Sequence, residues 1–201
     1  MAESLEFLME SISSVNSVSR VLGQKKTIVL IGMMGVGKSS VGWRLARRLG
    51  LPFCDSDREV EQAAGCSIPD IYALWGEAAF KEAERKVLRR LLDGGVHVLS
   101  TGDGSFTHAD LREQMLSTAL CVWLRADLET IYRRVHHRKT RPQLLNVDSR
   151  EVLADLLGER ERFYRQAHLV VDSQDEAHEV TVGRVLEGLA TYLNGGDGRD
   201  A

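Results

Sequence analysis

The sequence predicts a single α/β domain built on a parallel sheet. Five short apolar runs alternate with amphipathic stretches, which is the pattern of parallel strands joined by crossover helices. The runs show little polar alternation, so the sheet should be covered on both faces. The expected strands are 27–31, 52–55, 96–101, 120–124 and 169–172. Ligands of such sheets bind beyond the carboxyl ends of the strands, where we expect the functional site.

The composition indicates a water-soluble globule that acts on small molecules. The 201 residues carry a net charge of −3, with 43% hydrophobic and 27% charged residues. This balance provides no overall basic surface for nucleic acid or an anionic membrane. Cys54, Cys66 and Cys121 lack the spacing of a zinc site or a disulfide framework, so we expect buried free thiols. We therefore expect a cytoplasmic monomer with no nucleic-acid or membrane partner.

We expect residues 26–194 to form the domain. Residues 1–25 are rich in serine and contain acidic residues, and they lack the features of a signal or transit peptide. We interpret them as an N-terminal extension outside the fold. Residues 195–201 contain three glycines and are interpreted as a flexible tail.

The first strand leads into a glycine-rich segment, residues 32–39, with the sequence GMMGVGKS, and a helical pattern follows. This is the pattern of a phosphate-binding loop, in which backbone N–H groups form an anion nest at a helix N-terminus. Lys38 would reach the β- and γ-phosphates, and the Ser39 hydroxyl would ligate Mg²⁺. An ordinary glycine-rich turn is the alternative, but it leaves Lys38 unexplained. The predicted ATP-binding residues here are Gly35, Val36, Gly37, Lys38, Ser39 and Ser40.

Two carboxylates, Asp55 and Asp57, follow the second predicted strand. Residues two apart on an extended chain point to the same side, so both should face the nucleotide site. Such a pair can hold Mg²⁺, for which we select Asp55, and can take a proton from an attacking hydroxyl. The alternative is a helix N-cap at Asp57 beside a solvated Asp55.

The third predicted strand ends in the sequence Ser100-Thr101-Gly102-Asp103-Gly104. Its small residues allow a ligand to approach the backbone closely, which makes Gly102 and Gly104 candidates for substrate binding, and we include Asp103 between them. Asp103 has two possible roles. It could be a metal partner at the end of an apolar strand, or it could cap a helix that opens near Thr107.

A basic segment, residues 133–142, contains five cations and two histidines. We interpret it as a mobile lid that would bring positive charge to the phosphates and exclude water. A solvated helix face and an RNA-binding patch are the alternatives. The adjacent residues His136 and His137 would lie on different helix faces, which argues against a metal site there.

Two further cations occupy helical positions beside apolar stripes. Arg160 lies within a stripe formed by Val152, Leu153, Leu156, Leu157, Phe163 and Tyr164, on a helix with a capping-box-like start at Asp148 and Glu151. Its charge therefore needs an anionic partner in the interior, either a ligand carboxylate or phosphate or an internal salt bridge. Lys81 lies beside the stripe of the helix after Gly76, and we select it as a candidate for substrate binding, with an ordinary surface pair with Glu84 as the alternative.

Taken together, these residues resemble the shikimate kinase family from about Lys26 to Leu193. The matching features are residues 32–39, Asp55-Ser56-Asp57, the sequence WGEAAF at 75–80, Ser100-Thr101-Gly102, Arg141-Pro142-Gln143-Leu144-Leu145, and Arg160 four residues before Tyr164.

The resemblance implies a three-layer P-loop kinase fold with a five-stranded parallel sheet of order 2-3-1-4-5 and a mobile lid. It implies that Asp57 binds the acceptor hydroxyls and acts as the base. It also implies that Arg141 contacts the ATP phosphates, Arg134 stacks near adenine and Arg160 holds the substrate carboxylate. Phosphoryl transfer from Mg-ATP to the 3-hydroxyl of shikimate is the expected activity, within chorismate and aromatic amino-acid biosynthesis.

Two positions depart from the family pattern, and both concern the acceptor. The family has arginine in place of Lys81 and glycine in place of Asp103. Lysine cannot form the bidentate contact that a guanidinium makes with a carboxylate. Asp103 adds a carboxylate beside that of the substrate. Two alternatives therefore remain, a kinase of a related polyol or amino-polyol, and a nucleotide-binding relative with weakened acceptor chemistry.

Overall fold

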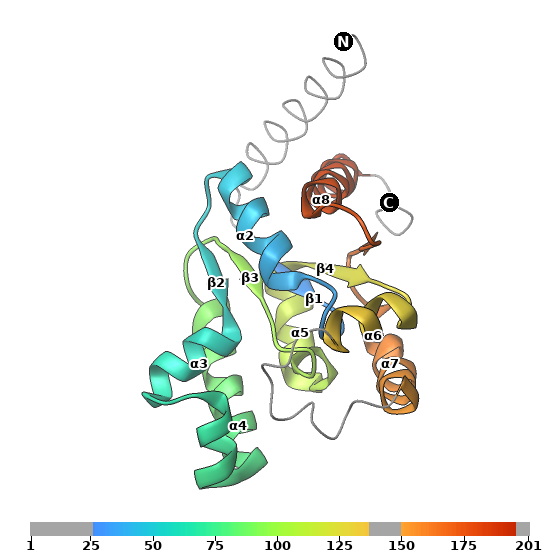
Figure 1. Cartoon of the computed structure of the whole chain (residues 1–201). Helices are drawn as coiled ribbons and strands as arrows, with labels where there is room; N and C mark the ends of the chain where they lie inside the picture. Colours follow the sequence, from blue (N-terminus) through green and yellow to red (C-terminus); the bar gives the residue numbers. More distant parts are fainter. Residues whose placement is uncertain (1–25, 137–149, 196–201) are drawn as a thin grey trace.

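The computed structural model of the chain describes residues 26–136 and 150–195 (Figure 1). The predicted N-terminal extension, most of the predicted lid including Arg141, the capping residue Asp148 and residues 196–201 lie outside the described residues.

The described residues contain one five-stranded sheet with the order β2-β3-β1-β4-β5, in which all neighbouring strands are parallel. The strands are β1 (Thr27–Ile31), β2 (Phe53–Asp55), β3 (Val98–Ser100), β4 (Ala119–Arg125) and β5 (Leu169–Asp172). The predicted fold class and strand order are confirmed. Two strands, β1 and β5, have the predicted bounds, whereas β2 and β3 are shorter and β4 is longer than predicted.

Helices cover both faces of this sheet (Figure 1). They are α2 (Lys38–Leu49), α3 (Ser56–Ala64), α4 (Ile68–Leu92), the short 3-10 helix η1 (Ser105–Thr107), α5 (Ala109–Thr118), α6 (Leu128–His136), α7 (Arg150–Tyr164) and α8 (His178–Leu193). Helices α2 and α8 pack against each other, and α5 packs against β4. Every residue of β1 is buried, as expected for a central strand covered on both sides.

Helix α4 shows how one glycine shapes the region that faces the site. Ser67 and Asp70 form a capping box at its start. Gly76 has a φ of 80°, which interrupts the helix with a kink. We predicted a helix only after Gly76, but the chain is helical on both sides of it. The predicted stripe is confirmed at Val87, Leu88 and Leu91, which are buried.

Two smaller predictions were wholly or partly wrong. Val152, predicted in the apolar stripe of α7, has an exposed fraction of 36%. Of the three free thiols, only Cys121 is buried, and Cys54 and Cys66 are half-buried. Burial raises the pKa of Cys121 to about 12, so its thiol stays protonated.

In the described part of the chain, no helix has both the length and the apolar character of a membrane span.

Candidate functional site

Two neighbouring cavities open beyond the carboxyl ends of β1, β2 and β3. The first, of about 70 Å³, is bounded by the glycine-rich loop. The second, of about 520 Å³, extends toward α3, α4 and α7. Five residues line both cavities, namely Ser39, Asp55, Asp57, Gly102 and Asp103. A group bound in the larger cavity would therefore meet a phosphate bound in the smaller one across this shared wall.

The glycine-rich loop connects β1 to α2 in the expected manner. Gly37 precedes α2 with a left-handed φ of 99°, which side chains rarely adopt, so the loop requires glycine there. The Lys38 ammonium is buried and donates to the backbone oxygens of Gly32 at 2.7 Å and Met33 at 3.0 Å. These contacts hold the positive charge directly over the loop, where a phosphate would lie.

Oxygen atoms suited to a hard divalent cation lie at the junction of the two cavities. The Ser39 hydroxyl donates to Asp55 Oδ2 at 2.6 Å, and it lies 3.3 Å from the Ser100 hydroxyl. Hydroxyl and carboxylate oxygens are ligands that Mg²⁺ prefers. Among the described residues, no group of three or more His, Cys, Asp or Glu side chains could hold a metal ion. The Ser39 and Asp55 oxygens would fit an Mg²⁺ ion whose other ligands come from phosphate and water.

The local structure around Asp55 and Asp57 differs from the prediction. Asp55 is the N-cap of α3, because its side chain accepts from the backbone N–H of Asp57 at 3.2 Å. Asp57 is neither the cap nor an extended residue, since it lies in the first turn of α3. Both carboxylates still line the two cavities, although the extended-chain argument for their orientation was wrong.

The loop after β3 packs tightly on two neighbouring elements. The Gly102 N–H donates to the buried Ser56 hydroxyl at 3.0 Å. A Cβ atom on Gly102 would lie 2.4 Å from Glu84 Oε1, so any side chain there would force the Glu84 carboxyl group to move. Asp103 is the N-cap of neither η1 nor α5, since Gly104 and His108 occupy those positions.

Glu84 is a buried carboxyl group that the sequence interpretation placed on the surface. Its exposed fraction is 5%, and its Oε1 accepts from the Ser105 hydroxyl at 2.8 Å. The pKa of Glu84 is raised to about 7, chiefly by burial and to a smaller extent by Asp57 and Asp103, while the Ser105 hydrogen bond and Lys81 lower it. The surface pair with Glu84, which was the alternative for Lys81, is not the one that forms, since Lys81 pairs with Glu77 at 2.7 Å, one turn earlier on α4.

Arg160 points into the larger cavity from α7, and its partner is Asp103. The two side chains form an ion pair and are only 18% and 21% exposed. The Tyr164 hydroxyl, one turn further along α7, donates to the backbone oxygen of Asp103. Burial is the largest single influence on the pKa of Arg160 and lowers it, but the charge and hydrogen bond of Asp103 and the contacts of Tyr164 together raise it, so the net direction is upward. The described residues thus form the internal salt bridge that was one of the two predicted alternatives for Arg160.

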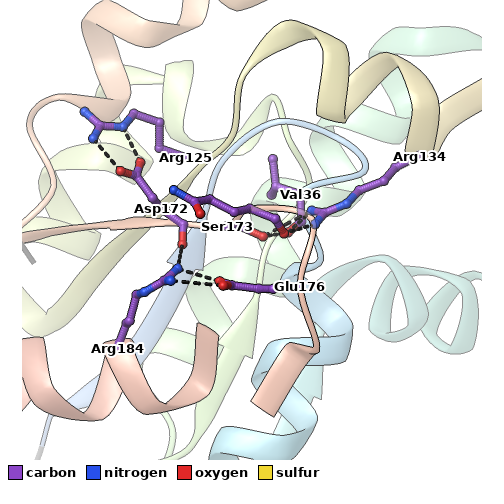
Figure 2. A network of polar contacts seen from close by, with 8 residues as sticks. Val36, Arg125, Arg134, Asp172, Ser173, Glu176 and Arg184 are labelled. Atoms are coloured by element: carbon purple, nitrogen blue, oxygen red, sulfur yellow. Dashed lines mark hydrogen bonds and ion pairs between the residues drawn. The ribbon is translucent and has the colours of Figure 1, made fainter. Parts of the chain in front are cut away.

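A second polar network joins the glycine-rich loop to the end of β5 (Figure 2). The buried Ser173 hydroxyl donates to the Val36 backbone oxygen at 2.8 Å. Arg134 donates to Ser173 at 3.1 Å and to the backbone oxygens of Val36 and Gln174. Arg184 forms a bidentate pair with Glu176 and also donates to the Asp172 backbone oxygen. These contacts fix the chain segment that runs beside the phosphate-binding loop.

The structure brings most of the predicted site residues to one edge of the sheet. Those around the two cavities are Gly35, Gly37, Lys38, Ser39, Ser40, Asp55, Asp57, Lys81, Gly102, Asp103, Gly104 and Arg160. Val36 and Arg134 lie in the network at the end of β5. The sequence interpretation missed the burial of Glu84 and the contacts of Ser173. Glu84 follows Phe80 and precedes Leu88 by four residues on the buried stripe of α4, a signal that could have identified it.

Comparisons with known proteins find relatives over most of the chain. A family model described as shikimate kinase matches residues 34–190. The shikimate kinase of Paramagnetospirillum magneticum is 53% identical over 84% of this chain and 87% of that protein. The shikimate kinase of Rhodopseudomonas palustris is 45% identical over 84% of this chain and 83% of that protein. A solved structure of shikimate kinase from Acinetobacter baumannii in complex with shikimate has a TM-score of 0.79 and 35% identity, and the match covers 84% of this chain and 95% of that one.

Proposed function

This chain belongs to the shikimate kinase family, and we propose on that basis that it transfers the γ-phosphoryl group of ATP to the 3-hydroxyl of shikimate. The observation that carries the proposal is the shared wall of the two cavities. Ser39, Asp55 and Asp57 line both the cavity of the phosphate-binding loop and the larger cavity beside it. Direct transfer requires this adjacency, because the acceptor oxygen must lie in line with the γ-phosphorus.

In the proposed reaction, the acceptor oxygen forms a bond to the γ-phosphorus as the bond between that phosphorus and the β,γ-bridging oxygen breaks. The hydroxyl proton passes to the Asp57 carboxylate, and ADP leaves with the electron pair of the broken bond. Lys38 and the backbone N–H groups of the loop stabilise the negative charge on the phosphate oxygens. Arg141, outside the described residues, and Arg134 are proposed as further nucleotide contacts.

Ser39 and Asp55 would hold Mg²⁺, directly or through water, and the ion would neutralise charge on the β- and γ-phosphates when bound. The larger cavity would bind the acceptor through Asp57, Arg160 and the backbone of Gly102 and Gly104. We further propose that the domain comprises residues 26–194 and acts as a cytoplasmic monomer, with no nucleic-acid or membrane partner.

The test is ADP release by the purified chain with Mg-ATP and millimolar shikimate, compared with the same mixture without shikimate. We expect shikimate-dependent ADP release and a product that carries phosphate on the 3-hydroxyl, as identified by ³¹P NMR. No stimulation by shikimate, in a preparation that binds Mg-ADP by calorimetry, would disprove the proposed acceptor while leaving the nucleotide site intact.

A further inference from the structure

The larger cavity carries an excess of negative charge. Six carboxyl groups line it, those of Asp55, Asp57, Glu61, Glu77, Asp103 and Glu84, against three Lys or Arg cations, Arg58, Lys81 and Arg160. Because the pKa of Glu84 is about 7, the other five carry most of this negative charge at neutral pH. The pKa of Tyr72, on the cavity wall, is raised to about 12, first by burial and then by four of these carboxylates. A ligand that brings its own carboxylate into this cavity therefore enters an unfavourable field unless a cation is available for it.

The three cations differ in how firmly they are held. Lys81 pairs with Glu77, but both side chains are about half exposed or more, so solvent competes with this pair. Arg58 is exposed at the start of α3. Arg160 is the most enclosed of the three, and only 18% of its side chain is accessible. Arg160 would therefore attract a ligand carboxylate most strongly, and it is already paired with Asp103.

The contact between Asp103 and Arg160 is held from two sides. Arg160 and Tyr164 lie one turn apart on α7, and they bind the side chain and the backbone oxygen of Asp103, respectively. Tyr164 is completely buried, so the backbone contact fixes the loop at this point. The Asp103 carboxylate, anchored in this way, has an effective concentration at Arg160 of millimolar order or more. A ligand carboxylate must compete with it.

We propose, on the basis of the function proposed above, that Asp103 is a specificity-determining residue whose carboxylate occupies the anion position of Arg160. An acceptor with a carboxylate must displace Asp103 before it can pair with Arg160. An acceptor that is neutral at this position has no such competitor. Asp103 therefore weakens the binding of shikimate and reduces the preference of the site for a carboxylate over an uncharged group.

The test is calorimetric titration of the full chain, with Mg-ADP present, using shikimate and its methyl ester as probes. The variants are Asp103→Gly and Asp103→Ala, and the matched control is Asp110→Ala, which removes a carboxylate paired with Arg85 and Arg89 outside the cavity. We expect both Asp103 variants to bind shikimate at least tenfold more tightly than the unmodified chain. The affinity for the methyl ester should change less than threefold, and the control should change neither affinity.

Two results would overturn the inference. The first is an unchanged or weaker affinity for shikimate in both Asp103 variants. The second is measured on the unmodified chain alone, and it is an affinity for shikimate more than tenfold higher than that for the methyl ester. Because these are binding measurements, an enzyme that binds shikimate without phosphorylating it would disprove the proposed function and not this inference.

Discussion

The nucleotide side and the acceptor side of the site are built by different means. On the nucleotide side, backbone groups dominate, since Lys38 and Ser173 bind carbonyl oxygens of the glycine-rich loop. On the acceptor side, ionisable side chains from separate elements bind one another, as Arg160 on α7 does with Asp103 after β3. Backbone contacts depend on a local motif, whereas side-chain pairs depend on the tertiary structure. A substitution can therefore change the acceptor side while the nucleotide side stays intact.

The largest expected effect is on the nucleotide side. Lys38→Ala should reduce kcat by about 100- to 1000-fold, because it removes a preorganised positive charge from the transferred phosphoryl group. Steady-state ADP release with saturating shikimate measures the effect. Lys86→Ala is a matched control, since Lys86 lies on the surface of α4 and pairs with Glu82. A kcat within threefold of the unmodified chain would mean that the loop lysine does not act on the phosphoryl group.

The next effect is on the acceptor side and concerns stability. The pKa of Glu84 is about 7 in the folded chain against an ordinary value of 4.5, so the folded state binds more protons between these values. The contribution of Glu84 to the free energy of unfolding is therefore complete below about pH 4.5 and is lost as the pH rises through 7. By linkage the loss is on the order of 3 kcal/mol.

Glu84→Gln should remove this loss, so the variant should gain stability relative to the unmodified chain as the pH rises from 5 to 8. Urea unfolding at several pH values measures the difference. The comparison must be made between the two proteins, because His108 and His168 have lowered pKa values and contribute a slope of opposite sign. Glu82→Gln, at an exposed position of the same helix, is the control. Parallel stability curves for Glu84→Gln and the unmodified chain would contradict the raised pKa.

The same contrast explains which features the sequence could predict. The strands β1 and β5 have their predicted bounds because a continuous apolar run defines each of them. The glycine-rich loop follows from a motif whose geometry is local. The salt-bridge partners of Asp103 and Lys81 could not be predicted from the sequence. The chain offers each of them several side chains of opposite charge, and only the packing of α4 and α7 selects among these. The burial of Glu84 did not follow for a simpler reason, since a carboxyl group ordinarily prefers solvent even at a position on an apolar stripe.

The smallest expected effect tests whether the two sides are separable. Ser173→Ala removes the hydroxyl that donates to the Val36 oxygen, a hydrogen bond that contributes about 1 kcal/mol, so the KM for ATP should rise about fivefold. The KM for shikimate should stay unchanged, because Ser173 lines neither of the two site cavities. Ser117→Ala, which removes an exposed hydroxyl bonded to backbone oxygens of α5, is the matched control. An equal rise in both KM values would show that the loop transmits its position to the acceptor cavity through their shared wall, and that the two sides act as one unit.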